Sequence, residues 1–208
     1  DEAKPWAPAE PHGTRGREEG PNNLPPEFTR LVGREQELAE LSTLLRRGDV
    51  RLVTLTGIGG TGKTRLACGV ARALLAEFSG GVFFVDLAPV NDPALAPSAI
   101  AQPLGVMEPR GGKPLVEALK ESLRDKKMLL VLDNFEQVTG AAPLVKELLA
   151  SAPGLKALVT SRVPLHLSAE QEFFVPPLDL PGATYQNSTP EGLMNSPAVA
   201  LFVERARA

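Results

Sequence analysis

Apolar residues along the chain follow two patterns that alternate from residue 34 onward. In several segments they recur every three or four residues, which is the spacing of amphipathic helices. Between these segments lie short apolar runs that are typical of β-strands. The predicted helices are residues 34–48, 65–78, 113–127, 142–154 and 197–208, with a partly helical segment at 92–106. The predicted strands are residues 50–57, 80–88, 128–133 and 155–161, and 172–178 is a candidate fifth strand.

Strands that alternate with helices indicate an α/β fold. Several of the predicted strands are apolar on both faces, which favours a parallel sheet covered by helices on its two sides. We therefore expect a doubly wound, mainly parallel sheet of about five strands. The Pro-rich residues 1–26 have the composition of a disordered linker or tail, and residues 27–180 form the expected α/β domain. Residues 181–208 are a loop and the first helix of a helical domain that we expect to continue beyond this sequence.

Two helical segments raise questions that the pattern leaves open. Pro97 and Pro103 are expected to break the segment 92–106. The last helix has an apolar side with no partner that the sequence identifies. This side consists of Val199, Phe202, Val203 and Ala206.

Composition excludes several classes of protein. The formal net charge of −3 gives no broad basic surface, so we expect no direct contact with nucleic acid. The single cysteine, Cys68, excludes an internal disulfide and is typical of a reducing compartment. No apolar run approaches the ~20 residues that a membrane-spanning helix needs. We therefore predict a cytoplasmic protein without membrane contact.

The segment GIGGTGKT, residues 57–64, separates the first predicted strand from the second helix. It matches the phosphate-binding loop G-x-x-x-x-G-K-[ST] at Gly57, Gly62, Lys63 and Thr64. Glycines allow backbone angles that turn successive N–H groups into one concavity, where they bind phosphate oxygens. The helix dipole, the lysine ammonium and the threonine hydroxyl complete a site for a nucleotide and Mg²⁺.

A second part of such a site is a carboxylate at the end of a neighbouring strand. Asp133 ends the wholly apolar run MLLVLD, and the carboxyl ends of parallel strands gather on the edge where ligands bind. Asp86 ends the run VFFVD and is a rival by the same argument, but the Asp133 strand is more apolar. By the same edge rule, Arg162 in VTSR can approach the terminal phosphate. An arginine that is exposed at the surface where the strand ends is an equally good interpretation.

Four features taken together resemble one family. They are LVGRE (31–35), LTGIGGTGKTRLA (55–67), LLVLDNFEQV (129–138) and LVTSR (158–162). The combination resembles the P-loop NTPase domain of signal-transduction ATPases with numerous domains (STAND), of the NB-ARC type. Within that group it is most similar to the nucleotide-binding module of large bacterial transcriptional regulators of the AfsR-like and LuxR types.

The resemblance implies ATP or ADP as ligand, with Mg²⁺ held by Thr64 and Asp133. It also implies that another strand lies between the phosphate-loop strand and the Asp133 strand, and that Arg162 senses the γ-phosphate. Val32, Gly33 and Arg34 are expected to lie against the adenine or its ribose. The residues expected around the phosphates are Gly57, Gly59, Gly60, Thr61, Gly62, Lys63 and Thr64, with Arg65 continuing the helix.

Whether the nucleotide is hydrolysed depends on a group that orients or deprotonates water. Asn134 stands where many related ATPases have a carboxylate, and an amide can orient water but cannot accept its proton. Glu136 is a further candidate, with an exposed position in the next element as an equally good interpretation. We therefore expect slow turnover, with Asp133, Asn134 and Arg162 as the catalytic residues.

The predicted function is an ATP/ADP-dependent switch with slow hydrolysis inside a transcriptional regulator. Expected partners are other domains of the same protein, namely a DNA-binding effector and helical and sensor or repeat domains, with self-association as a further possibility. The alternative is an ordinary P-loop ATPase or small-molecule kinase with steady turnover. A GTPase is disfavoured because no Asn-Lys-x-Asp follows the later strands, and an intact phosphate loop disfavours a nucleotide-free scaffold.

Overall fold

A parallel five-stranded sheet forms the centre of the molecule, as the computed structural model shows for residues 20–26, 30–109, 111–181, 193 and 196–207. The strand order is β2-β3-β4-β1-β5, and every neighbouring pair is parallel. The strands are β1 (Leu52–Thr56), β2 (Gly81–Asp86), β3 (Met128–Asp133), β4 (Leu155–Thr160) and β5 (Glu170–Phe174). The doubly wound α/β fold is therefore confirmed, and the fifth strand is present beside β1.

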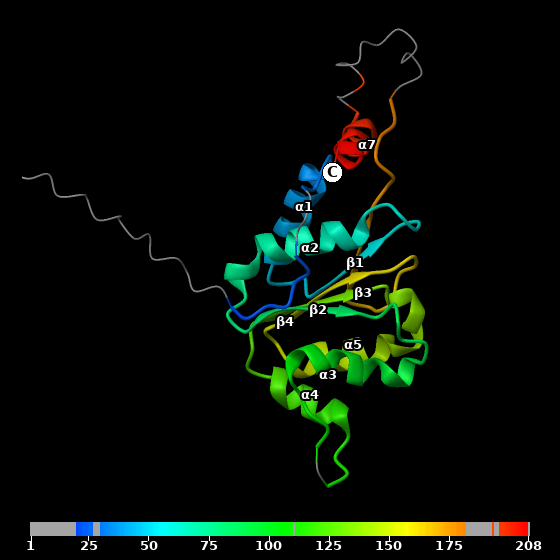
Figure 1. Ribbon diagram of the computed structural model, residues 1–208. Helices are drawn as coiled ribbons and strands as arrows, with labels where there is room; N and C mark the ends of the chain where they lie inside the picture. The colour runs from blue at the N-terminus through cyan, green and yellow to red at the C-terminus, as the bar shows by residue number, and fades with distance from the viewer. Residues whose placement is uncertain (1–19, 27–29, 110, 182–192, 194–195, 208) are drawn as a thin grey trace, which may run out of the picture.

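Helices cover both faces of this sheet (Figure 1). α1 (Glu35–Arg46) and α2 (Lys63–Ala73) lie on one face, and α3 (Ala96–Leu104), α4 (Leu115–Leu123) and α5 (Ala142–Ser151) lie on the other. α7 (Pro197–Arg207) follows the sheet in the chain. Short 3-10 turns complete the elements: η1 (Leu75–Glu77), η2 (Pro93–Leu95) and η3 (Phe135–Ala141).

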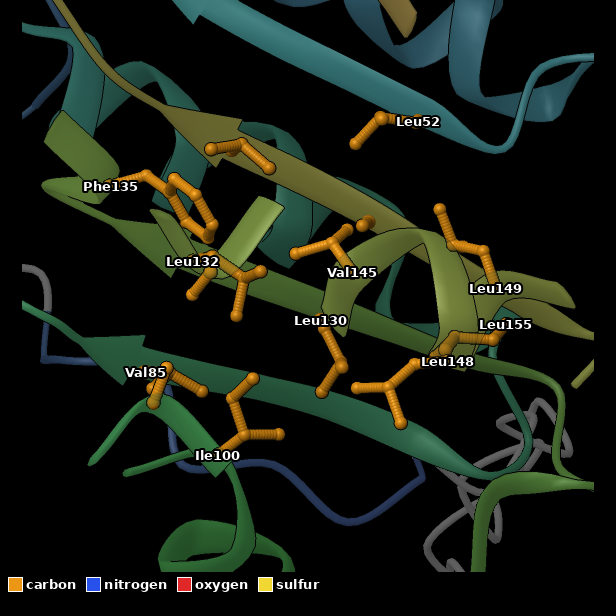
Figure 2. Packing of buried hydrophobic residues seen from close by; sticks show 14 of the residues in the cluster. Leu52, Val85, Ile100, Leu130, Leu132, Phe135, Val145, Leu148, Leu149 and Leu155 are labelled. Atoms are coloured by element: carbon orange, nitrogen blue, oxygen red, sulfur yellow. The ribbon is translucent and has the colours of Figure 1, made fainter. Parts of the chain in front are cut away.

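Successive side chains of β3 point to opposite faces of the sheet, so they belong to two separate parts of the core. Leu129 and Val131 belong to the cluster under α1 and α2. Leu130 and Leu132 belong to the cluster under α3, α4 and α5, where Figure 2 shows them facing Val145 and its neighbours on α5. Because both faces of β3 are buried, the run MLLVLD is wholly apolar until it reaches Asp133.

The sheet order explains where the site lies. β4 stands between β1 and β3, as the resemblance implied, and β2 lies at the edge. β1 therefore ends one strand away from β3, with the carboxyl ends of both at the same edge of the sheet. This arrangement brings the phosphate loop after β1 close to the acidic end of β3.

Two helices differ from the expectation. α3 continues through Pro97 and Pro103. Pro97 lies in the first turn, where its missing N–H has no helical partner in any case, and Pro103 lies in the last turn, just before Gly105 ends the helix with φ 66°.

In α7, Phe202 is 73% exposed, and the residues that face the domain are Ala198, Leu201 and Arg205.

Residues 20–26, which composition places in the tail, run along the outer edge of β2. Asn22 bridges Val82, and the Val82 N–H donates to the Pro21 carbonyl at 3.0 Å. The Asn23 side chain donates to the Phe84 carbonyl at 2.8 Å and accepts from the Phe84 N–H at 2.6 Å. The domain thus begins before residue 27, because an open strand edge offers backbone groups that this segment pairs. The expected tail at residues 1–19, and most of the loop at 182–195, lie outside the described residues.

Candidate functional site

The loop between β1 and α2 has the backbone of a phosphate cradle. Gly57, Gly60 and Gly62 have φ of 146°, 84° and 90°, a region that side chains disfavour. A Cβ on Gly57 would also lie 2.6 Å from the Val175 carbonyl oxygen, so this position has no room for a side chain. α2 begins directly at Lys63, which places the free N–H groups of its first turn beside the loop.

Lys63 lies inside this loop. Its side chain is only 9% exposed, and the ammonium donates to the carbonyls of Gly57 at 2.7 Å and Ile58 at 2.9 Å. Burial lowers the pKa of Lys63, while the carboxylates of Glu136 and Asp133 oppose this shift and the Arg162 guanidinium adds to it. These four charged groups therefore act on one another at a single place.

Asp133 is the centre of a hydrogen-bond network at the end of β3. The Thr64 hydroxyl donates to Asp133 Oδ1 at 2.8 Å, and the Thr160 hydroxyl donates to the same oxygen at 2.5 Å. Asn134 has left-handed backbone angles, with φ 59°, and its side-chain amide donates to Asp133 Oδ2 at 3.0 Å. The predicted partners Thr64 and Asp133 are therefore in direct contact.

The Asp133 carboxylate is 3% exposed, and burial raises its pKa. The hydrogen bonds from Thr160 and Thr64 oppose this shift, whereas the charges of Asp86 and Glu136 add to it.

The rival Asp86 is exposed at the sheet edge, and its Oδ1 accepts from the Ala88 N–H at 2.9 Å. Asp86 reaches the network only through the Asn134 amide, at 3.5 Å, so the geometry favours Asp133.

Arg162, at the end of β4, lies beside the phosphate loop. Its guanidinium would be 3.7 Å from a Cβ built on Gly59, and with Gly57 and Ile58 it lines a hollow of about 390 Å³. Its Nε donates to Glu136 Oε1 at 3.1 Å. Glu136 is only 15% exposed, so the exposed-residue interpretation of Glu136 is wrong, and its place at the site is the feature that the sequence left open.

A second, larger pocket of about 470 Å³ adjoins the glycine loop. It lies between the loop, the segment at 31–34, the segment at 177–178 and the inner side of α7. Gly33 has φ 65°, and a Cβ there would lie 2.3 Å from the side chain of Pro197, so α7 starts directly against this glycine. The lining residues are Leu31, Val32, Arg34, Ile58, Gly59, Gly60, Thr61, Gly62, Arg65, Pro177, Leu178, Ala198, Leu201 and Arg205.

Arg34 is 5% exposed and connects the walls of this pocket. Its guanidinium donates to the Thr61 carbonyl at 3.2 Å, to the Pro176 carbonyl and to Glu37. Arg65 also lines the pocket, and its guanidinium donates to the Arg30 carbonyl at 2.8 Å. Val32, Arg34 and Arg65 therefore line one pocket beside the glycine loop, and both arginines are bonded to the protein itself.

This donor set fits a magnesium nucleotide. A hydroxyl and a carboxylate 2.8 Å apart, Thr64 and Asp133, are the oxygen ligands that Mg²⁺ prefers. The glycine backbone, the Lys63 ammonium and the start of α2 fit phosphate groups. The adjoining pocket, with the apolar side chains of Leu31, Val32 and Leu201, fits a base and sugar.

Comparison with known proteins gives a family match over the part of the chain that holds this site. Residues 46–173 match the family model described as "AAA domain", so the match includes the phosphate loop, Asp133 and Arg162. Within the described residues no helix is long and apolar enough to cross a membrane.

Similar sequences occur in bacterial regulators. The chain is 37% identical over 157 residues, 75% of its length, to a protein of Mycobacterium tuberculosis named as a candidate HTH-type transcriptional regulator. It is 35% identical over 158 residues, 69% of its length, to the regulatory protein AfsR of Streptomyces coelicolor. In both cases it spans only 16% of the longer relative.

Solved structures share the fold. Cdc6p of Pyrobaculum aerophilum has a TM-score of 0.51 at 22% identity, covering 73% of this chain and 47% of that one. The ORC2 protein of Aeropyrum pernix, solved as ADPNP–ADP complexes, has a TM-score of 0.52 at 18% identity, covering 74% of this chain and 50% of that one.

Proposed function

Because the chain belongs to the AAA-domain family of P-loop proteins, we propose that it is an ATP/ADP-binding switch module, with slow ATP hydrolysis, in a signal-responsive transcriptional regulator. The observation that carries this proposal is the direct contact of Thr64 with Asp133, at the start of the helix that Lys63 opens. That contact joins the two metal-ligand types to an intact phosphate cradle.

The regulatory context rests on the relatives, which are named as transcriptional regulators. The assignment to the STAND ATPases of the NB-ARC type rests on the four sequence motifs around residues 31, 57, 133 and 162. The effector that contacts DNA and the sensor domains belong, in this proposal, to other parts of a longer protein. Binding and loss of the γ-phosphate would shift how these domains pack, or whether copies associate.

Each residue has a defined task in this proposal. The backbone N–H groups at 59–64 bind the phosphate oxygens, and Lys63 adds a full positive charge near the β- and γ-phosphates. Thr64 and Asp133 hold Mg²⁺, which supplies charge that neutralises the phosphates when it is bound. Arg162 reaches the γ-phosphate from the end of β4, and the pocket beside Val32 and Leu201 takes the adenosine.

The first experiment measures nucleotide binding directly. Lys63→Ala should weaken ATP and ADP binding by at least about a hundredfold, because a charge-assisted contact in a partly dry site is lost. Thr64→Ala should remove the Mg²⁺ dependence of the binding. Isothermal titration calorimetry of the intact chain with each nucleotide, with and without Mg²⁺, provides the measurement.

The matched control is Lys146→Ala, an exposed lysine of α5 on the opposite side of the sheet. This variant should bind nucleotide as the wild type does, and circular dichroism should show that all three variants are folded. Unchanged ATP affinity in folded Lys63→Ala would overturn the assignment of the phosphate loop.

An ordinary P-loop ATPase with steady turnover is the second candidate. One observation favours it: the half-buried carboxylate of Glu136 lies within hydrogen-bond distance of Arg162, so a proton acceptor is present beside the loop. The two candidates share the binding site and differ in the rate at which the bound ATP is hydrolysed.

A further inference from the structure

Glu136 has a feature that neither binding nor folding explains. Its Oε2 atom is buried and has no hydrogen-bond partner among the described residues. A buried carboxylate oxygen without a partner costs free energy, so its presence in a native protein calls for an explanation, of which a catalytic role is one. Its other oxygen, Oε1, accepts from Arg162 Nε at 3.1 Å.

This carboxylate lies near the phosphate loop, on the side where Arg162 stands. Arg162 connects it to the loop, since the same guanidinium lies next to Gly59. The charges of Glu136 and Lys63 act on each other, as do those of Glu136 and Asp133. Glu136 lies in the first turn of η3, directly after Asn134, whose left-handed backbone turns the chain at the end of β3.

The other polar groups at the end of β3 are already used. Asp133 accepts hydrogen bonds at both oxygens, from Thr64, Thr160 and Asn134. The Asn134 amide nitrogen donates to Asp133 and cannot accept a proton from water. Glu136 therefore has what these groups lack, which is a carboxylate oxygen that accepts no hydrogen bond from the described residues.

We propose that Glu136 is the general base of ATP hydrolysis at this site, and that its ion pair with Arg162 restrains it until the γ-phosphate attracts Arg162. This inference rests on the proposed function. In the step, a water oxygen bonds to the γ-phosphorus while the bond from that phosphorus to the β–γ bridging oxygen breaks. The water proton goes to Glu136 Oε2, and the products are ADP and inorganic phosphate.

The experiment compares Glu136→Gln with wild type and with Glu172→Gln in the intact chain. Glutamine keeps the size of the side chain and an oxygen that accepts from Arg162, but it does not accept a proton at neutral pH. Glu172 is the matched control because it lines the same hollow as Arg162, yet it is exposed and bonded to Thr56 at 2.7 Å. Calorimetry gives ATP and ADP affinity, and a phosphate-release assay gives turnover.

The expected result is a loss of about a hundredfold or more in phosphate release for Glu136→Gln, which is the usual contribution of a general base. Its ATP affinity and melting temperature should stay close to those of the wild type, whereas a merely structural role for the carboxylate would lower the melting temperature and leave the turnover of the folded protein unchanged. Glu172→Gln should hydrolyse ATP at the wild-type rate.

Two results would overturn the inference while leaving the proposed function intact. These are turnover in Glu136→Gln equal to that of wild type, or a selective loss in Glu172→Gln. Wild-type protein that binds MgATP and releases no phosphate would overturn both the inference and the hydrolysis part of the proposed function, leaving only its nucleotide-binding part. If the wild-type chain binds no adenine nucleotide, the proposed function itself fails. The binding and turnover measurements thus separate the two failures.

Discussion

Single side chains of this protein do different work according to how many partners they have. Within the described residues, the Lys63 ammonium donates only to two carbonyls of the loop and the Thr64 hydroxyl only to Asp133, so a bound ligand can replace these contacts. Arg34 is the opposite case, because its guanidinium bonds the loop at Thr61, the chain at Pro176 and the helix α1 at Glu37. Arg34 therefore organises the nucleotide pocket rather than offering a free cation to it.

Arg34→Lys should consequently affect the pocket although the charge is kept. The three donors of a lysine ammonium all lie on one nitrogen, so it cannot reach three separated acceptors as the planar guanidinium does. We expect the free energy of unfolding to fall by about 1–3 kcal/mol and ATP affinity to fall roughly tenfold, since buried carbonyls lose their donor. Urea denaturation and calorimetry measure the two effects.

The control for this variant is Arg124→Lys, at the exposed end of α4, which should change neither quantity. If Arg34→Lys binds ATP as tightly as wild type, Arg34 does not organise the pocket.

At the scale of elements, the inner strands of the sheet and its edge strand β2 differ in how their backbone groups are paired. β3 and β4 are paired on both sides, whereas β2 lies at the edge and presents unpaired backbone groups. The segment 20–26 pairs part of that edge, and the Asn23 amide exchanges two hydrogen bonds with the backbone of Phe84. A side chain here takes the place of a neighbouring strand.

Asn23→Ala should destabilise the domain by about 1–2 kcal/mol, because each of the two hydrogen bonds contributes on the order of 1 kcal/mol. Nucleotide affinity should not change, since β2 is the strand farthest from the loop in the sheet order. Chemical denaturation monitored by circular dichroism is the appropriate measurement. Asn91→Ala, in the exposed segment after β2, is the control that should leave stability unchanged.

For the whole molecule, the pocket joins parts of the chain that are far apart in sequence. The segment at 31–34 and the start of α7 meet at Gly33 and Pro197, and the glycine loop closes the pocket between them. A nucleotide in this pocket would therefore contact the sheet domain and α7 at the same time. This arrangement suits a switch, because a change at the phosphates can alter how α7 sits on the domain.

The rate of ATP hydrolysis is a property of the whole site, and we expect it to be low. We expect fewer than ~1 hydrolysed ATP per second, below the usual range of enzymes, because Asn134 cannot act as a base and Glu136 acts only while the γ-phosphate draws Arg162 away from it. Phosphate release from saturating MgATP is the measurement. Brisk, saturable turnover would favour the ordinary ATPase over the switch.

The sequence by itself determined the order of strands and helices along the chain and the glycine-rich loop, and it favoured Asp133 over Asp86 as the predicted metal-binding acid. These are local properties: side-chain periodicity fixes a helix or strand, and eight consecutive residues build the loop from their own backbone. Only the tertiary structure decided that Glu136 pairs with Arg162, that Asn23 pairs the edge of β2, and that α7 meets Gly33. Each of these contacts joins residues distant along the chain, so its geometry exists only once the sheet has placed both partners, and no local pattern encodes it.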